Sequence, residues 1–215
     1  MTDRRSLSGV ESAAHREILL RKIEAAIHAG VDWIQIREKD LLGREGASLA
    51  CEALQRAAKS PVSKARPTRI LINDRLDVAL AENAGGVHLG ENSLPLAETK
   101  RLVTAQAGTR DFLIGVSCHS SEAAESAASG GADYLFFGPV FATPSKAVFG
   151  APQGLERLAE ACRTVSIPVL AIGGITLANA SYCLSAGASG IAAIRLFQDA
   201  PDISPIVHSL KTLAR

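Results

Sequence analysis

The chain has 215 residues, with 23 Lys and Arg against 22 Asp and Glu, so its formal net charge is +1. This balance argues against wholesale attraction to nucleic acid or to a membrane surface, and we expect neither as a partner. Hydrophobic residues make up 47% of the chain, yet no apolar run reaches the length of a membrane-spanning helix. The length fits one domain over residues 1–215 with a substantial core.

Two features bear on the compartment. The amino-terminal residues Met1–Arg5 lack the apolar stretch of a secretory signal. The cysteines are too widely spaced for a C-x-x-C metal or redox pair, at Cys51, Cys118, Cys162 and Cys183. We interpret them as small buried hydrophobic residues and expect a cytoplasmic location.

Short apolar runs alternate with helical stretches along the whole chain. The first helical stretch carries Leu19, Ile23 and Ile27 at a spacing near i, i+4 and ends before Gly30. Strands are then predicted, in chain order, at 33–37, 69–73, 86–89, 113–117, 134–138, 169–172 and 190–194. Most of these runs are continuously apolar, which is typical of parallel strands covered on both faces. Such repeated βα units predict a TIM (β/α)8 barrel, with a doubly wound sheet as the alternative.

The predicted barrel lacks its first strand in this chain, because seven strands are found where eight are expected. Residues 1–4 read like the loop after a strand whose body is absent. We therefore hypothesise that the working protein begins several residues upstream. Seven strands leave two unpaired edges, so we expect the chain to be poorly soluble, or to close its gap as a homo-oligomer or by strand exchange.

Polar residues gather where the predicted strands end, which is where barrel enzymes build their active sites. Gln35, Arg37 and Lys39 alternate along the end of one strand, so all three face the same side, the barrel interior. An interior charge is costly unless it is paired or ligated, so we expect Arg37 and Lys39 to bind an anionic group. A solvated strand end is the alternative.

The next strands end in residues suited to metal binding and proton transfer. Asp74, after Asn73, is interpreted as an oxygen ligand for Mg²⁺, with a helix N-cap as the alternative. Ser117 and His119 end the fourth predicted strand, and His119 is a candidate acid, base or hydrogen-bond donor. A purely structural role for His119 stays open. His88, inside an earlier short strand, is expected to be a packing residue.

Two later loops are candidates for phosphate binding. The loop after the fifth predicted strand carries Thr143, Ser145 and Lys146, whose two hydroxyls and one cation are suited to clasping a diphosphate. A plain surface loop is the alternative. Gly173 and Gly174 follow the sixth predicted strand and permit a close backbone approach to a ligand. Anions also bind readily at the amino end of a helix such as the one that follows.

Taken together, these runs resemble the thiamine-phosphate synthase and thiazole tautomerase superfamily. The matching pieces stand in family order and cover about residues 15–197: Gln35-Ile-Arg-Glu-Lys39, Ile72-Asn-Asp74, Gly86-Val-His-Leu-Gly90, Gly115-Val-Ser-Cys-His119, Gly131-Ala-Asp-Tyr134, Gly138-Pro-Val-Phe141 with Thr143-Pro-Ser-Lys146, and Ala171-Ile-Gly-Gly-Ile175. The resemblance implies a phosphate-binding TIM barrel that acts in thiamine biosynthesis.

The resemblance also implies a transferase that joins a hydroxymethylpyrimidine diphosphate to a thiazole phosphate and releases diphosphate. Small phosphorylated pyrimidine and thiazole molecules are the implied partners, and Mg²⁺ is the implied cofactor with Asp74 as one ligand. The diphosphate and pyrimidine contacts carried over by position are Gln35, Arg37, Lys39, Asn73, Thr143, Ser145 and Lys146. The candidate catalytic residues are Lys39, His119 and Lys146, and the further substrate-binding candidates are Ser117, Gly173, Gly174 and Arg195.

Two positions depart from the family pattern. Ser93 stands where the synthase usually carries a second magnesium Asp, and Glu91 lies two residues too early to be assumed a substitute. Arg195, at the end of the last predicted strand, would replace a phosphate-binding Ser or fill the pocket with a different charge. Two alternatives therefore stay open. One is a thiazole tautomerase, which needs no metal and would use His119 as its acid/base group; the other is a non-catalytic thiamine-phosphate-binding paralogue.

Overall fold

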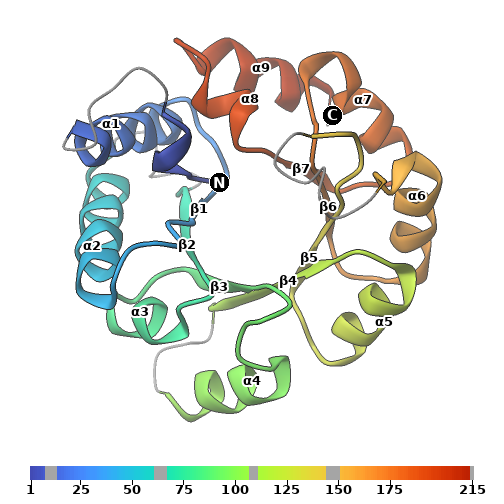
Figure 1. Ribbon diagram of the computed structural model, residues 1–215, viewed down its shortest axis with the longest axis horizontal. Coiled ribbons are helices and arrows are strands. Elements are labelled where there is room, and N and C mark those ends of the chain that lie inside the picture. The colour runs from blue at the N-terminus through green and yellow to red at the C-terminus, as the bar shows by residue number, and fades with distance from the viewer. Residues whose placement is uncertain (8–13, 61–66, 107–110, 144–150, 214–215) are drawn as a thin grey trace.

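The computed structural model describes residues 1–7, 14–60, 67–106, 111–143 and 151–213. Within these residues seven parallel strands form one sheet in the order β1-β2-β3-β4-β5-β6-β7, and it curls into a ring with helices outside (Figure 1). The strands are β1 Trp33–Ile36, β2 Arg69–Asn73, β3 Gly86–Leu89, β4 Leu113–Cys118, β5 Tyr134–Phe137, β6 Val169–Ile172 and β7 Gly190–Ala192. The sequential order confirms the predicted barrel class and rules out the doubly wound sheet, whose strand order reverses.

Helices connect successive strands and cover the outside of the sheet. They are η1 Arg4–Ser6, α1 His15–His28, α2 Gly43–Lys59, α3 Leu76–Ala81, α4 Leu96–Ala105, α5 Ser121–Ser129, α6 Gly154–Thr164, α7 Leu177–Ser185, α8 Arg195–Gln198 and α9 Ser204–Leu213. The apolar stripe predicted for the first helical stretch is buried in α1. Across the described ranges, no helix is both long and apolar enough to span a membrane.

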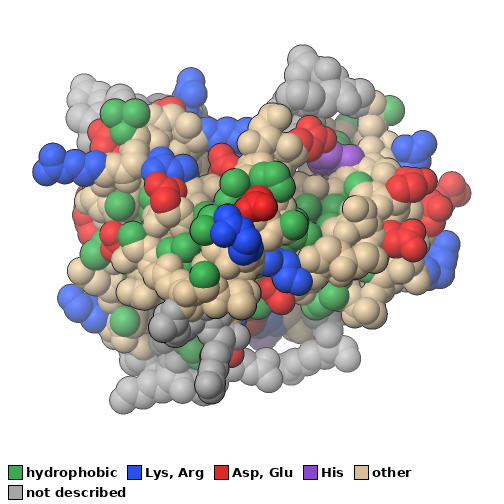
Figure 2. All heavy atoms as spheres, turned by 90° about the horizontal axis from the view of Figure 1, so that it is seen from below, with side chains coloured by type: hydrophobic (Ala, Val, Ile, Leu, Met, Phe, Trp, Pro, Cys, Tyr) green, Lys and Arg blue, Asp and Glu red, His purple; other side chains and the backbone are tan. Residues whose placement is uncertain are grey.

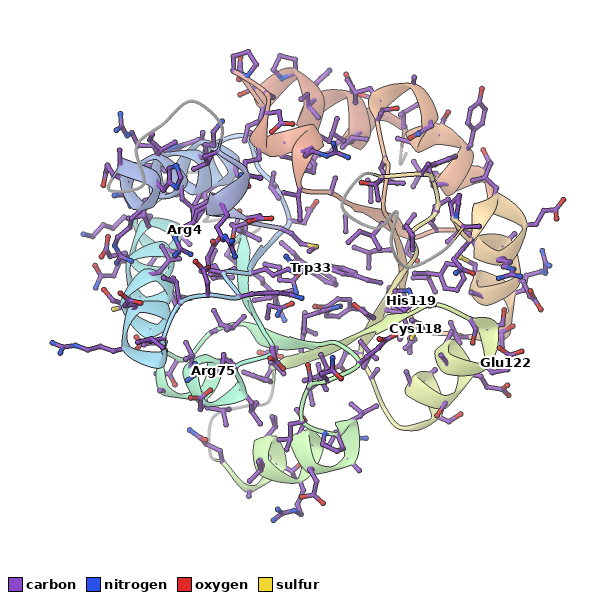
Figure 3. All side chains as sticks on the ribbon, viewed as in Figure 1. Arg4, Trp33, Arg75, Cys118, His119 and Glu122 are labelled. Carbon is purple, nitrogen blue, oxygen red and sulfur yellow. The ribbon has the colours of Figure 1, made fainter. Side chains whose placement is uncertain are left out.

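Burial on both faces explains why the strands are continuously apolar. In β2, Ile70 and Ile72 belong to the core between the sheet and the helices, whereas Leu71 belongs to the core inside the barrel with Tyr134. Successive side chains of a strand point to opposite faces, so a strand buried on both needs apolar residues at every position. Trp33 of β1 lies at the centre of the ring (Figure 3), where its ring centroid is 4.7 Å from that of Tyr134 and the two ring planes are tilted by 56°.

The end of the last strand differs from the prediction, because β7 stops at Ala192 and Arg195 begins the short helix α8. Here Phe197 and Gln198 donate their backbone N–H groups to the Ile194 carbonyl, at 3.1 and 2.8 Å. Among the described strands β7 pairs only with β6, so no second described strand competes with these helical bonds. Arg195 is therefore presented from a helix and not from a strand.

The sheet is open between β1 and β7, which do not pair with each other. The first residues lie at the carboxyl end of this gap (Figure 1): the Met1 amine donates to the Ala193 carbonyl at 3.1 Å, and the Thr2 N–H to the Gln35 carbonyl at 2.9 Å. A cavity of about 490 Å³ fills the rest of the gap and is lined mainly by apolar side chains of both strands, α1 and α9. The prediction that one strand is missing is confirmed for the described residues, whereas solubility and oligomerisation stay predictions.

Charges of both signs are scattered over the side of the molecule on which α3, α4 and α5 lie (Figure 2). Small groups of hydrophobic atoms lie between them, and no field of a single sign covers this face. The distribution agrees with the formal net charge of +1.

Candidate functional site

A second cavity, of about 510 Å³, opens at the carboxyl ends of the strands. The sequence-predicted residues that line it are Gln35, Arg37, Lys39, Asn73, Asp74, Ser117, His119, Thr143, Gly173, Gly174 and Arg195. The structure thus brings together every predicted site residue that it describes. Ser145 and Lys146, the other two, lie outside the described residues.

Gln35 and Asn73 form the inner part of this cavity from neighbouring strands. Gln35 is 3% exposed and donates from Nε2 to the Asn73 side-chain oxygen at 2.9 Å. The other amide atom, Gln35 Oε1, is also buried, and no described residue donates to it. A buried acceptor without a donor costs about 1–3 kcal/mol. An N–H or O–H group of a ligand is what this atom lacks.

Arg37 places a guanidinium group inside the mouth of the barrel. The residue is half-buried, and no carboxylate of the described residues forms an ion pair with it. Its backbone N–H is fixed by the Thr2 hydroxyl oxygen at 2.9 Å. Its charge adds to burial in lowering the pKa of His88 to about 3. A half-buried cation without a counter-ion favours an anionic ligand.

Arg4 orders the segment that carries Arg37 and Lys39. Its guanidinium donates to the two carboxylate oxygens of Asp40 at 2.8 and 2.9 Å, and to Glu38 Oε2 at 3.2 Å. The Glu38 side chain is only 2% exposed. Burial alone would raise the pKa of Asp40, but the hydrogen bonds and charge of Arg4 hold it below its usual value. Sequence reasoning missed this cluster, although Glu38 and Asp40 alternate with the inward-facing residues.

Replacing Arg4 with Ala should destabilise the fold, because the buried Glu38 carboxylate would lose its charged partner and keep only the hydrogen bond from the backbone N–H of residue 4, at 2.9 Å. We expect a loss of about 1–3 kcal/mol in the free energy of unfolding, measured in urea at pH 7. The Asp40 part of this loss should shrink in acid. Since the folded pKa of Asp40 lies below its unfolded value near 4, that stabilisation is present above about pH 4 and is lost as the pH falls through the folded pKa.

The matched control is Arg5→Ala, which removes the same charge from an exposed neighbouring position. It should change stability by no more than about 0.5 kcal/mol. Equal losses for the Arg4 and Arg5 variants would show that the Arg4 cluster does not hold the segment.

His119 follows β4 and lies on the side of α5 that faces the strands, whereas Glu122 points outward (Figure 3). Its Nδ1 is hydrogen-bonded to the Gly138 carbonyl oxygen. A carbonyl can only accept, so Nδ1 carries a proton. Its Nε2 lies 3.6 Å from Oε1 of Glu91, an exposed residue that also lines the cavity. Nε2 is therefore the ring atom that a ligand would meet.

Asp74 and Ser93 stand on the cavity wall where a metal was predicted. Asp74 has a φ of 67°, a left-handed conformation that Asp tolerates better than most residues, and Arg75 and not Asp74 is the N-cap of α3. No described side chain donates a hydrogen bond to the Asp74 carboxylate. The Ser93 hydroxyl accepts from the Gly90 N–H at 2.7 Å and closes the turn after β3. No group of three or more His, Cys, Asp or Glu within the described ranges could hold a metal ion.

Arg195 reaches the cavity from the start of α8 and donates to the Thr143 hydroxyl oxygen at 2.8 Å. These residues are 52 positions apart in the sequence. The bond therefore ties α8, which follows β7, to the loop that follows β5. Two candidates that the sequence analysis named separately form one cationic corner of the cavity.

Gly173 and Gly174 have φ values of 95° and 66°, in the left-handed region that favours glycine. A Cβ at Gly173 would lie 2.5 Å from the Pro139 Cβ, and one at Gly174 would lie 2.7 Å from the Ala142 carbonyl oxygen. The close approach that we expected for a ligand is thus made by the chain's own loop, whose Phe141 N–H donates to the Gly173 carbonyl at 3.0 Å. The two glycines hold this loop at the rim of the cavity.

His88 is buried, as expected of a packing residue, and both of its ring nitrogens are also hydrogen-bonded. Its Nε2 lies 2.9 Å from the Ser117 hydroxyl oxygen, and its Nδ1 lies 3.1 Å from the Tyr134 hydroxyl oxygen. A single His in an apolar strand gives no sequence signal for such partners. The period-2 pattern does contain a hint, because His88, Gly115 and Ser117 all fall on inward-facing positions of β3 and β4.

Comparison with known proteins identifies the family. The profile of the thiamine monophosphate synthase family matches residues 10–197. The chain is 40% identical over 210 residues to a thiamine-phosphate synthase of Roseiflexus sp. (strain RS-1), an alignment that covers 98% of this chain and 81% of the relative. It is 42% identical over 192 residues to a thiamine-phosphate synthase of Methanoculleus marisnigri, which covers 89% of this chain and 85% of the relative.

Solved structures agree with the sequence matches. The thiamine phosphate pyrophosphorylase from Pyrococcus furiosus superposes with a TM-score of 0.80 at 31% identity, over 99% of this chain and 92% of that one. A 3-hexulose-6-phosphate synthase shares the fold, with a TM-score of 0.65 at 19% identity over 93% of this chain and 95% of that one. Fold and cavity define an α/β-barrel enzyme with its site at the carboxyl ends of the strands. The chain belongs to the thiamine monophosphate synthase family, whose members are transferases of thiamine biosynthesis.

Proposed function

We propose that the chain joins a hydroxymethylpyrimidine diphosphate to a thiazole phosphate and releases diphosphate. The names of its relatives, thiamine-phosphate synthases at about 40% identity over most of the chain, support this reaction. The observation that carries the proposal is Arg37, whose guanidinium lies in a cavity of about 510 Å³ without a carboxylate partner among the described residues. A diphosphate supplies the anion that this cation lacks.

Neutralising the leaving group is the main task of such a site. When the carbon–oxygen bond to diphosphate breaks, negative charge grows on the diphosphate and positive charge on the pyrimidine methylene carbon, which the thiazole ring nitrogen then attacks. Preorganised cations and hydroxyls lower this barrier. Arg37 and Lys39 after β1 would meet the diphosphate, together with Arg195 and Thr143 from the cationic corner. Ser145 and Lys146 stay predicted as further contacts.

The pyrimidine ring is proposed to lie against Gln35 and Asn73. The buried Gln35 Oε1 would accept a hydrogen bond from the amino group of the pyrimidine, which gives this orphaned atom its missing donor. The bond from Gln35 Nε2 to Asn73 fixes the orientation of the amide and leaves Oε1 as the atom without a donor. Phe136, which also lines the cavity, offers an apolar surface for the ring.

Mg²⁺ is proposed as the cofactor, with Asp74 as its protein ligand. The Asp74 carboxylate lines the cavity without a hydrogen-bond donor among the described side chains, and carboxylate oxygen suits a hard cation, so the residues present fit this group. When bound, Mg²⁺ would neutralise charge on the departing diphosphate. Glu91 offers a second carboxylate on the same wall.

Mg²⁺ should bind weakly to the free protein and more tightly with the diphosphate substrate, because one or two carboxylates leave most ligand positions to water and phosphate. Titration calorimetry with and without substrate would measure the difference. Ser93→Asp should raise turnover at limiting Mg²⁺, since a carboxylate there can reach the cavity from the turn closed by the Gly90 N–H. Ser93→Ala, which adds no carboxylate, is the control. Tight binding to the free protein, or no gain for Ser93→Asp with an intact fold, would contradict the assignment.

The decisive assay uses the purified protein with both substrates and Mg²⁺. Formation of thiamine phosphate and diphosphate, lost on chelation of the metal, is the expected result. Conversion of a thiazole carboxylate phosphate without metal would instead favour the tautomerase alternative, with His119 as its acid/base group. Stabilisation by the substrates without any turnover would favour the non-catalytic alternative. The single-domain organisation, the cytoplasmic location and homo-oligomerisation stay predictions.

A further inference from the structure

We propose that His88 is a positioning residue whose Nε2–H group aims the Ser117 hydroxyl proton into the substrate cavity. His88 joins the buried Tyr134 hydroxyl, 3.1 Å from Nδ1, to the Ser117 hydroxyl, 2.9 Å from Nε2. Ser117 lines the cavity, whereas Tyr134 lies behind it. The kinetic part of this inference rests on the proposed synthase function, and the hydrogen-bond assignment does not.

Tyr134, His88 and Ser117 form a hydrogen-bonded relay that spans the three strands β3, β4 and β5. A glycine on the middle strand makes this relay possible. Gly115 of β4 is the register partner of His88 on β3 and of Tyr134 on β5. A Cβ at Gly115 would overlap with the Cζ and hydroxyl oxygen of Tyr134. The Tyr134 side chain therefore lies over the bare backbone of β4 and reaches His88 two strands away. Local sequence and register together build this contact.

The direction of the first hydrogen bond follows from burial. Tyr134 is 0% exposed, and burial, followed by the charge of Asp133, raises the pKa of its hydroxyl, so the hydroxyl keeps its proton. His88 is its hydrogen-bond partner among the described residues. A buried O–H that donates to nothing costs about 1–3 kcal/mol. The Tyr134 hydroxyl therefore donates to His88 Nδ1, which must be the unprotonated nitrogen.

The direction of the second bond follows from the first. An unprotonated Nδ1 makes the buried His88 ring a neutral imidazole. A neutral imidazole carries one proton. Because Nδ1 accepts from Tyr134, that proton lies on Nε2, and Nε2–H donates to the Ser117 hydroxyl oxygen. The Ser117 oxygen therefore accepts a hydrogen bond from His88, and its own hydrogen stays available for another partner.

This arrangement makes the Ser117 hydroxyl a hydrogen-bond donor toward a ligand in the cavity. The free hydrogen of Ser117 can donate to an acceptor atom in the cavity, and the class that fits is a phosphate or diphosphate oxygen of the substrate. Hydrogen bonds in a chain polarise one another, so donation into Ser117 strengthens donation from it. If His88 carried its proton on Nδ1 instead, Ser117 would donate back to Nε2 and present only lone pairs to an anion.

The direct test is the tautomer of His88, read from ¹⁵N chemical shifts of its ring nitrogens in the purified protein near pH 7. The expected result is a protonated Nε2 and an unprotonated Nδ1. A protonated Nδ1 would overturn the proposal. This measurement needs no turnover, so it decides the hydrogen-bond assignment even if the chain forms no thiamine phosphate and the proposed function fails.

A double-mutant cycle tests the positioning role. Tyr134→Phe keeps the ring in the core and removes only the hydroxyl that fixes the tautomer; we expect kcat/KM to fall about 10-fold, the effect of one hydrogen bond. Ser117→Ala should lower it by at least as much. In the Ser117→Ala background, Tyr134→Phe should cost less than about 2-fold, because the group that it orients is gone. Additive losses would mean that Tyr134 and His88 act only on the fold.

His88→Gln and His88→Leu provide a second comparison. The Gln amide can still donate to Ser117, whereas Leu keeps bulk without a donor, so the Gln variant should retain about 10-fold more activity. Affinity for inorganic diphosphate should follow the same order. Equal activity and equal diphosphate affinity in the two folded variants would overturn the positioning role.

Discussion

Arg37→Met should lower kcat/KM for thiamine phosphate formation by about 10²–10³-fold, the effect of removing one preorganised group that stabilises developing charge. The same change should leave the melting temperature equal or higher. Arg37 has no carboxylate partner among the described residues, so its replacement breaks no ion pair that the structure describes. Activity and stability are therefore expected to move independently, as they do where a residue is retained for ligand binding.

Three further variants sharpen this test. Arg37→Lys should give an intermediate loss, because it restores the charge without the bidentate fork. His119→Ala should reduce synthase turnover less than Arg37→Met does, since departure of diphosphate depends on charge neutralisation. Arg101→Met removes an exposed Arg on α4 that pairs with Glu98, and it should leave kcat/KM unchanged. If Arg37→Met cost no more activity than the Arg101 variant, the cavity would not bind diphosphate through Arg37.

An apolar strand of five residues joined ahead of Met1 should raise the melting temperature by about 5–10 °C. The gap between β1 and β7 offers it two unpaired strand edges and an apolar cavity of about 490 Å³. Each buried Val, Ile or Leu contributes about 1.5–3 kcal/mol, and ordering each residue costs about 1–2 kcal/mol. The net gain is a few kcal/mol, and each kcal/mol shifts the melting temperature of a domain of this size by about 2–4 °C.

The direction of the added strand is fixed by bonds already present. Met1 contacts Ala193, directly after β7, and Thr2 contacts Gln35 of β1, so a preceding segment enters the gap parallel to both strands. A Gly/Ser segment of equal length is the matched control, since it can reach the gap but buries little apolar area. The soluble yield should rise with the apolar segment alone. Equal melting temperatures for the two fusions would mean that the gap does not accept a strand.

The arrangement of the strands and most residues that line the cavity could be predicted from the sequence, because both follow from simple periodicity. Gln35, Arg37 and Lys39 alternate along one strand end, and parallel strands end at a common edge. Asn73 and Asp74 could be placed beside them for the same reason, once the βα repeat was recognised.

Contacts that depend on register across several strands could not be predicted in this way. The relay from Tyr134 to Ser117 needs three strands at matched heights and an empty position at Gly115. The Arg4 cluster needs a segment far from Glu38 in the sequence to fold back on it. Arg195 was matched to a Ser at the last strand of the family pattern, but helical hydrogen bonds to Ile194 determine its local structure.

The empty position at Gly115 has an evolutionary consequence. Because any side chain there would occupy the space of the Tyr134 ring, the two positions cannot vary independently. In relatives that carry Ala or a larger residue at the position of Gly115, we expect a residue smaller than Tyr at the position of Tyr134. The hydroxyl that fixes the tautomer of His88 would then be lost. Such relatives should then carry, at the position of His88, a residue whose donor needs no fixing, such as Gln or Asn. Correlated substitutions at the positions of His88, Gly115 and Tyr134 would show that the three residues evolve together.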